Sequence, residues 1–134
     1  MADWTGMSRS NYVKLINVPV LEQLFPDAVV TEKEGLCCIY SDHCHGDTPA
    51  AERGDENAPF FEDNGLEDYV GLIDVIHLFL EKEPDNVFVW ITAGHEKARY
   101  VTGHAIAIDH TGTILDRVSL DDIYDDTNWN RAEY

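Results

Sequence analysis

Two neighbouring apolar segments, 87–93 and 100–108, constrain the fold of this chain more than any other feature. In segment 87–93 aliphatic residues alternate with two aromatic residues and a threonine, so both faces of the strand are mainly apolar. The charged run 94–98 between the segments has the length of a turn. The pattern predicts two adjacent strands, with 87–93 central in its sheet.

The second strand also predicts how a helix packs on the sheet. Its alternation places four small residues on one face, and such a face lets a helix approach closely. The small residues are Val101, Gly103, Ala105 and Ala107. Segment 67–82 is the best candidate for the helix, because Asn64 and Glu67 resemble a capping box and five apolar residues follow at helical spacing. These five are Tyr69, Leu72, Ile73, Ile76 and Leu80.

Shorter patterns predict the remaining elements. Strands are expected at 12–16, 28–31, 36–40 and 113–118. Two short helices are expected, one from Asn17 to Pro26 and one at 120–125, the latter capped by Ser119 and Asp122. The predicted class is α+β, with an antiparallel sheet of about five or six strands, one main amphipathic helix on one face and two short helices.

The chain length predicts one domain. A chain of 134 residues with 44% hydrophobic content can bury a single core, so we expect a single domain over 1–134. Segment 41–66 is nearly devoid of aliphatic residues and rich in acidic residues, glycine and proline. It is predicted to be a long acidic loop.

The net charge restricts the partners. Asp and Glu number 26 against 9 Lys and Arg, a net charge of −17, which argues against direct binding of nucleic acid and favours a cationic partner. Solubility and adaptation to high salt are equally compatible with this charge. The sequence has no membrane-spanning apolar run and no signal peptide, and its three cysteines suit a reducing compartment, so a cytoplasmic location is expected.

One set of residues suggests an enzyme. Cys37 or Cys38, followed by His104 and Asp116, resembles the chain order of papain-like cysteine hydrolases. Their nucleophile sits at a helix N-terminus, which lowers the thiol pKa, whereas 36–40 reads as a strand. His104 and Asp116 share a face only if the intervening hairpin loop has an odd number of residues, and the sequence leaves the loop length open.

Another set suggests a metal site. Cys38, His43, Cys44 and His45 lie within a short stretch, but adjacent ligands such as the last two rarely reach one zinc ion. No phosphate-binding loop occurs in the sequence. No cofactor is therefore expected, and structural zinc is kept as an alternative.

The acidic residues form the remaining candidate site. Carboxylates in two segments, interleaved with aromatic residues, could imitate the charge of a nucleic-acid backbone and occupy a basic groove on another protein. The expected partner-binding residues are Asp55, Glu56, Phe60, Phe61, Glu62, Asp63, Asp121, Asp122, Tyr124, Asp125, Asp126 and Trp129. Tyr69 is a further aromatic residue among the acids.

Three segments resemble small acidic accessory proteins of phages and plasmids. They are 8–13 (SRSNYV), 94–103 (GHEKARYVTG) and 118–124 (VSLDDIY). The resemblance implies a mobile-element origin, where such proteins inhibit host-defence nucleases or DNA-binding proteins, and it transfers no site residue. We therefore expect a non-enzymatic inhibitor of the anti-restriction or anti-CRISPR type, a DNA mimic that docks on a basic, nucleic-acid-binding protein. The cysteine hydrolase is the alternative.

Overall fold

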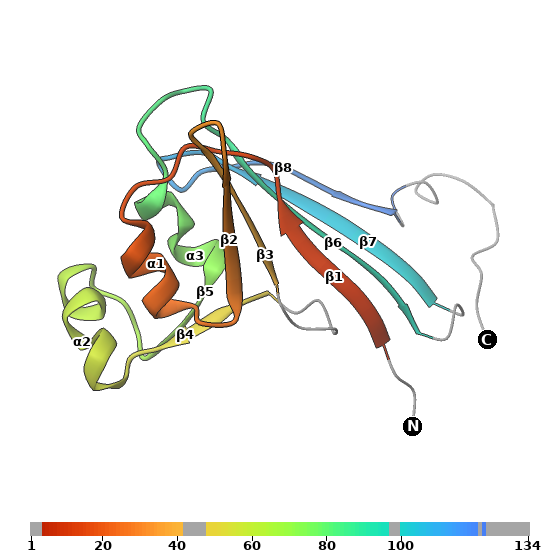
Figure 1. Ribbon diagram of the computed structural model, residues 1–134. Helices are drawn as coiled ribbons and strands as arrows, with labels where there is room; N and C mark the ends of the chain where they lie inside the picture. The colour runs from red at the N-terminus through yellow and green to blue at the C-terminus, as the bar shows by residue number, and fades with distance from the viewer. Residues whose placement is uncertain (1–3, 42–47, 97–99, 121, 123–134) are drawn as a thin grey trace.

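The computed structural model describes residues 4–41, 48–96, 100–120 and 122, and its fold is α+β (Figure 1). The larger sheet has six strands in the order β2-β3-β1-β6-β7-β8, and every pairing is antiparallel. Its strands are β1 (Trp4–Ser10), β2 (Ala28–Lys33), β3 (Leu36–Ser41), β6 (Phe88–Glu96), β7 (Tyr100–Ile108) and β8 (Ile114–Ser119). The predicted fold class is confirmed.

The helices and a small second sheet gather at one end of the larger sheet. In Figure 1 the right-hand halves of β1, β6, β7 and β8 extend beyond them. These elements are α1 (Val18–Leu24), β4 (Ala50–Glu52), α2 (Gly54–Asp63), β5 (Tyr69–Gly71), α3 (Leu72–Val75) and the 3-10 helix η1 (Ile76–Phe79). Within the described ranges, no helix has the length and apolar character needed to cross a bilayer.

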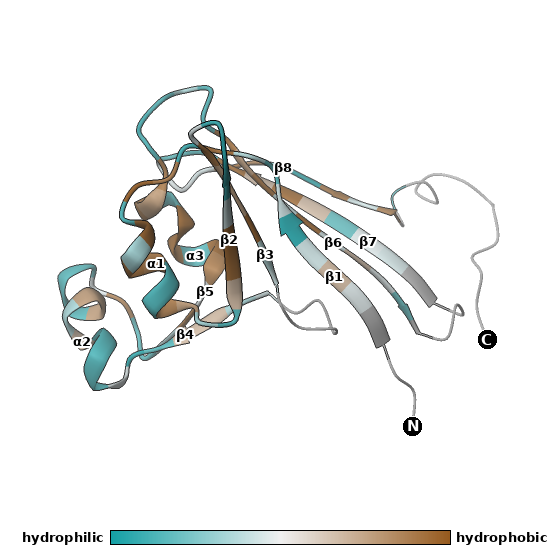
Figure 2. Ribbon diagram, in the orientation of Figure 1, coloured by the Kyte–Doolittle hydropathy of each residue, from teal (hydrophilic) through white to brown (hydrophobic). Residues whose placement is uncertain are grey.

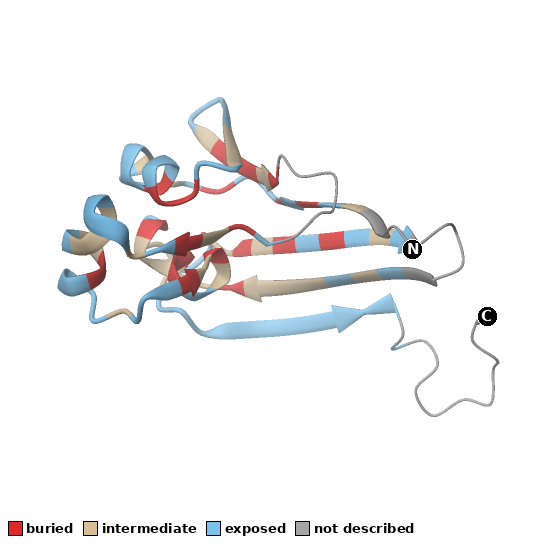
Figure 3. Cartoon of the chain, turned by 90° about the horizontal axis from the view of Figure 1, so that it is seen from below, coloured by how far each residue is buried: buried red, intermediate tan, exposed pale blue. Residues whose placement is uncertain are grey.

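The hydrophobic core lies between this helical end and one face of the larger sheet. Phe88 and Trp90 of β6, which stack with ring centroids 5.9 Å apart, face Leu72 and Phe79 from the α3–η1 segment within one buried cluster. Apolar residues dominate α3 in Figure 2, and buried residues concentrate in the same part of the molecule in Figure 3. The core therefore covers only part of the sheet.

The helices cover the opposite face of β7 from the one expected. Ile106 and Ile108 pair with Trp90 and Phe88 and join the core, so the small residues of β7 lie on the other face. Large apolar side chains bury more surface than glycine or alanine, which favours packing on this side. β6 lies between β1 and β7, so its predicted central position is confirmed, although Ile91 on its other face is 45% exposed.

Segment 67–82 does not form one continuous helix. Asn64, predicted to start it, is the C-terminal cap of α2, and Gly65 follows in the left-handed region with φ 61°. Residues 69–71 pair with β4, and helical turns begin only at Leu72, where the Asp74 carboxylate accepts a hydrogen bond from the Gly71 N–H at 2.9 Å. Strand pairing in the small sheet thus replaces the first helical turn.

The first strand lies earlier than predicted. Segment 12–16 contributes only isolated bridges, from Val13 to Cys37 and from Leu15 to Leu80, whereas β1 spans 4–10. The Asn11 side chain ends the pairing of β1 with β6, because its amide bonds the backbone of both Val87 and Val89. The strand prediction for 12–16 is therefore wrong.

The predicted acidic loop contains regular structure. β4 and α2 both lie within 41–66, and Phe61 anchors α2 in the core with no exposed surface. A single buried aromatic residue can fix a polar helix, because most helical stability in proteins comes from tertiary packing. The loop prediction is wrong for 50–63, and its part at 42–47 falls outside the described residues.

The β2–β3 hairpin and α1 form where predicted. Lys33 pairs with Leu36, so Glu34 and Gly35 make a two-residue turn with φ of 54° and 81°. Positive φ at both positions is typical of a type I′ turn, whose twist matches the strands. The predicted helix at 120–125 lies largely outside the described residues, although Asp122 accepts a hydrogen bond from the Ser119 N–H at 2.8 Å.

Candidate functional site

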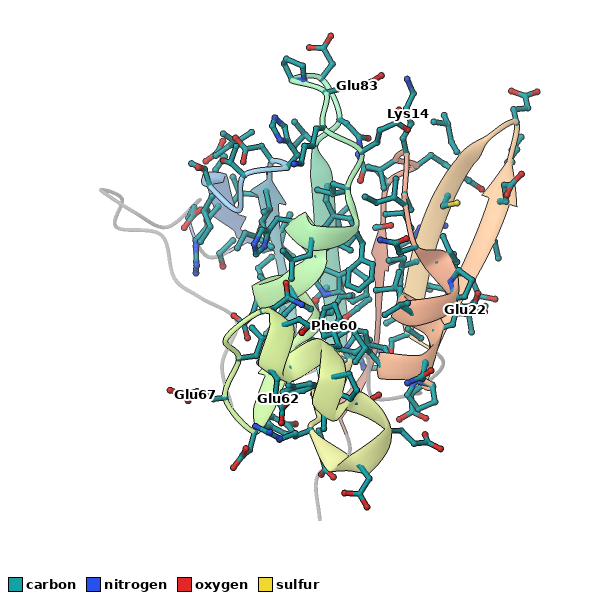
Figure 4. The ribbon with its side chains drawn as sticks, turned by 90° about the vertical axis from the view of Figure 1, so that its left-hand side faces the viewer. Lys14, Glu22, Phe60, Glu62, Glu67 and Glu83 are labelled. Carbon is teal, nitrogen blue, oxygen red and sulfur yellow. The ribbon has the colours of Figure 1, made fainter. Side chains whose placement is uncertain are left out.

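Seven exposed carboxylates and one exposed tyrosine lie on the segment that runs from β4 through α2 to β5. They are Glu52, Asp55, Glu56, Glu62, Asp63, Glu67, Asp68 and Tyr69. We call this set the α2 acidic surface. In Figure 4, Glu62 and Glu67 lie at the same end of the molecule, far from Lys14 and Glu83. Seven exposed carboxylates thus lie close together in sequence at one end of the fold, while others, such as Glu32 and Asp85, are exposed elsewhere.

The position of the acids along α2 does not follow from helix stability alone. Asp55 and Glu56 in the first turn favour the helix, because negative charge interacts well with the N-terminal end of its dipole. Glu62 and Asp63 lie at the other end, where negative charge is unfavourable, and the last turn has no basic residue. The second pair therefore costs helix stability.

One cation lies within the α2 acidic surface, and it is already paired. Arg53 Nη2 is 2.6 Å from Glu62 Oε1, and its Nη1 is 4.0 Å from Asp68 Oδ1. These contacts join the beginning of α2 to its end and to the segment before β5. Five carboxylates of the surface have no ion pair within the described part of the chain.

Tyr69 lies between two hollows in this surface. One hollow of about 720 Å³ is lined by Arg53, Asp55 and Glu62, and the other, of about 520 Å³, by Gln23, Asp27 and Glu56. Glu52 and Tyr69 line both hollows, and Tyr69 is 65% exposed. The surface therefore presents a projecting ring between two acidic depressions.

The two phenylalanines predicted to bind the partner are part of the core instead. Phe61 has no exposed surface, and Phe60 stacks on Phe79 with ring centroids 5.6 Å apart (Figure 4). Burial on their own protein stabilises the fold and removes both rings from contact with a partner. The partner-binding prediction for Phe60 and Phe61 followed from the expected loop, whereas Tyr69 is the exposed ring.

Of the second predicted acidic segment, the structure describes only Asp122, and this residue does not lie beside the α2 acidic surface. Asp122 follows β8, whose end lies at the opposite side of the molecule from α2 (Figure 1). The other predicted residues of this segment fall outside the described ranges. They are Asp121, Tyr124, Asp125, Asp126 and Trp129.

The proposed nucleophile and base are far apart. Cys37 and Cys38 lie on β3 and His104 on β7, with β1 and β6 between these strands. Three strand spacings amount to about 14 Å, well beyond hydrogen-bond reach. Both cysteines are buried, and burial, then the charge of Glu32, raises the pKa of the Cys37 thiol. The thiol is therefore less reactive than a free cysteine.

His104 and Asp116 lie on opposite faces of the sheet. Ile108 pairs with Ile114, so the loop has an odd number of residues and alone would place both on one face. A β-bulge then shifts the register, so that Asp116 pairs with Ala107 and His104 with Ser119. The bulge, which the sequence pattern does not reveal, therefore decides which face each residue occupies.

The predicted zinc ligands cannot be assembled from the described residues. Cys38 lies within β3, where its Sγ accepts a hydrogen bond from Arg9 Nη2 at 3.3 Å. His43, Cys44 and His45 fall outside the described residues. Among the side chains that the structure does describe, no three His, Cys, Asp or Glu residues gather as metal ligands would.

Comparison with protein-family models, curated proteins and solved structures finds no match to this chain. The α2 acidic surface remains the candidate site, on the basis of its own residues.

Proposed function

We propose that this chain is a non-enzymatic inhibitor that docks through the α2 acidic surface on the basic groove of a nucleic-acid-binding protein. The observation that carries the proposal is the concentration of seven exposed carboxylates around one paired guanidinium. A basic groove that neutralises phosphates offers the complementary charge. The inhibitor would compete with nucleic acid for this groove.

Long-range attraction and short-range contact have separate roles in this mechanism. Carboxylates at the surface accelerate encounter over a range of about 8 Å at physiological ionic strength. Tyr69, projecting between two hollows, supplies an aromatic contact of the kind that dominates interface energetics. Charge therefore sets the association rate, and the ring sets the dissociation rate.

The unfavourable placement of Asp63 supports the proposal. Glu62 and Asp63 both oppose the dipole of α2, but Glu62 is compensated by its ion pair with Arg53, whereas Asp63 has no ion pair with any described residue, so local stability alone favours a neutral or basic residue at position 63. Functional surfaces commonly retain residues that cost stability. The mobile-element origin stays a prediction from the resemblance of the three sequence segments.

The test compares two variants of equal net charge. The first, Glu56→Gln/Asp63→Asn/Glu67→Gln, removes charge from the α2 acidic surface and leaves both partners of Arg53 intact. The control, Glu22→Gln/Glu32→Gln/Glu34→Gln, removes as much charge from α1 and the β2–β3 hairpin. Immobilised wild type and both variants are incubated with bacterial lysate, and retained proteins are quantified by mass spectrometry.

We expect wild type and the control to retain a nucleic-acid-binding protein that the first variant loses and that added duplex DNA displaces. With that protein purified, affinity should fall at least about tenfold as salt rises from about 50 to 500 mM. Tyr69→Ala should raise the dissociation rate with little effect on association. Equal loss in both triple variants, or affinity independent of salt, would contradict the proposal.

A further inference from the structure

The face of β1, β6, β7 and β8 that points away from the core carries one row of four residues in register. They are Arg9, Ile91, Ala105 and Val118. Trp90 and Ile106 lie on the other side of these strands, within the core that the helical end covers (Figure 1). We call the face that contains the row the outer face.

The outer face is exposed and largely apolar. Met7, Ile91 and Val118 are 56, 45 and 54% exposed. A Cβ at Gly103 of this face would lie 2.8 Å from Leu120 Cδ1, so the Leu120 side chain covers Gly103 here and is itself 58% exposed. The solvent-facing side of an antiparallel sheet is normally polar, and contiguous exposed apolar patches mark interaction surfaces.

The charge of the outer face differs from that of the whole chain. Among its described strand residues, Asp116 is the one carboxylate and Arg9 the one guanidinium, whereas the chain holds 26 Asp and Glu. A basic partner therefore finds little complementary charge on this face. A second copy of the chain, which carries −17 and is repelled by acidic surfaces, can approach the outer face with less repulsion.

Arg9 and Asp116 are arranged so that the outer face complements itself. Neither forms an ion pair with any described residue, and they lie on β1 and β8, with β6 and β7 between them. A two-fold axis between two stacked outer faces, bisecting the line from Arg9 to Asp116, exchanges the two positions. Each Arg9 then faces Asp116 of the second copy, and Ile91 and Ala105 lie near the axis.

We propose that two copies of this chain stack their outer faces in a two-fold dimer. Four strands of six to nine residues have a flat area of roughly 400–550 Å² per copy, at about 4.8 Å between strands and about 3.3 Å per residue. Protruding side chains add to this area, so a pair reaches the roughly 1,000 Å² of a specific interface. The α2 acidic surface belongs to other elements and stays available in both copies.

Sedimentation velocity of the purified chain between about 1 and 200 μM tests the proposal. We expect the mass to rise from that of one chain to that of two as concentration increases. The dimer should tighten as salt rises from about 50 to 500 mM, because salt screens the repulsion between like-charged copies. Docking of the α2 acidic surface has the opposite salt dependence, so the two proposals fail separately. A monomer at about 200 μM and about 500 mM salt would overturn the dimer.

A charge exchange tests the pairing of Arg9 with Asp116. Arg9→Glu and Asp116→Arg should each raise the dimer dissociation constant at least about tenfold, because like charges then face each other twice across the axis. The double variant should return to within about threefold of wild type. Asp116→Arg lowers the net negative charge, so a general charge effect has the opposite sign. A double variant as weak as the single ones would overturn the arrangement.

A matched pair of lysine variants locates the interface. Ile91→Lys places a charge at the centre of the outer face and should abolish the dimer. Val20→Lys makes the same change at an aliphatic residue of α1 that is 38% exposed, and it should leave the dimer intact. Urea unfolding checks that both variants fold. A dimer that survives Ile91→Lys would use another surface, such as the edge of β8, and would overturn the proposal.

Discussion

The side chain of Asn86 hydrogen-bonds both backbone polar groups of Lys14. Its Oδ1 accepts the Lys14 N–H at 2.9 Å, and its Nδ2 donates to the Lys14 carbonyl at 2.8 Å and to the Glu81 carbonyl at 2.9 Å. Asn86 is 7% exposed, so its loss leaves the Lys14 N–H without this acceptor, whereas the Lys14 and Glu81 carbonyls keep the bonds that they accept from the Glu81 and Glu83 N–H groups. We expect Asn86→Ala to lower the free energy of unfolding by about 2–3 kcal/mol in urea denaturation.

Asn64 provides the control for this prediction. Its amide donates one hydrogen bond to the Phe60 carbonyl from an exposed position, where water can replace it. Asn64→Ala should therefore cost about 0.5 kcal/mol. Equal losses in the two variants would show that the paired amide of Asn86 does not hold segment 11–16.

Phe61 and Tyr69 should separate stability from binding. Phe61→Ala removes a fully buried ring and should cost about 3–5 kcal/mol of unfolding free energy. Tyr69→Ala, at a position 65% exposed, should change stability by less than about 0.5 kcal/mol. Urea unfolding measures both effects. A large stability loss in Tyr69→Ala would mean that this ring supports the fold instead of a partner.

The β2–β3 hairpin can be stabilised at Glu34. Its φ of 54° lies in the left-handed region, which asparagine adopts more easily than glutamate. Glu34→Asn should raise the unfolding free energy by about 0.5 kcal/mol. Glu34→Gln removes the same charge without this backbone preference, so thermal unfolding should show less stabilisation. Equal stabilisation by Glu34→Asn and Glu34→Gln would show that the effect comes from the removed charge.

Cys37 should react slowly. Burial, followed by the charge of Glu32 and then Cys38, raises the pKa of its thiol, so little thiolate forms at neutral pH. Alkylation by iodoacetamide, mapped by peptide mass spectrometry, should be at least about tenfold slower at Cys37 than for free cysteine. Urea should abolish the difference. Labelling faster than that of free cysteine would restore the hydrolase alternative.

Asp109 should make stability depend on pH. Its Oδ1 accepts the Thr111 hydroxyl at 2.6 Å and the Thr111 and Thr113 N–H groups at 2.9 and 3.1 Å. The bond from the Thr111 hydroxyl is the main reason that the pKa of Asp109 lies below its ordinary value of 3.8. The stabilisation from these hydrogen bonds is thus complete above pH 3.8 and is lost as the pH falls through the lowered pKa of Asp109.

Asp109→Asn tests this dependence. The difference in unfolding free energy between wild type and variant should be constant above pH 5 and shrink as the solution is acidified toward pH 2. Urea denaturation at a series of pH values gives the difference. A difference in unfolding free energy that increases as the pH falls would contradict a lowered pKa for Asp109.

Local sequence patterns predicted the elements that depend on neighbouring residues. The β2–β3 hairpin has a two-residue turn between alternating runs, and β6, β7 and β8 follow one another through short connections. β1 was missed because its pattern is inverted: Ser8 and Ser10 are buried while Met7 is 56% exposed. Ser8 bonds Thr92 at 2.9 Å and Ser10 bonds the Ile39 N–H, so only the tertiary partners explain this burial.

The negative charge of the candidate site could be predicted from the sequence, but its shape could not. Composition identified the acids on α2, whereas the exposure of Tyr69 and the burial of Phe61 depend on how α2 packs. Aromatic residues among acids look alike in a sequence whether they anchor a helix or contact a partner.

β8 closes one side of the larger sheet with its six residues all exposed, and among the described strands it pairs with β7 alone (Figure 3). An unprotected edge strand of this kind offers a template for strands from other molecules, and the apolar residues of β8 are 45–54% exposed. At neutral pH, repulsion between copies that each carry −17 keeps such borders apart. Acidification protonates carboxylates and weakens this repulsion, so we expect self-association along β8 to increase as the pH falls.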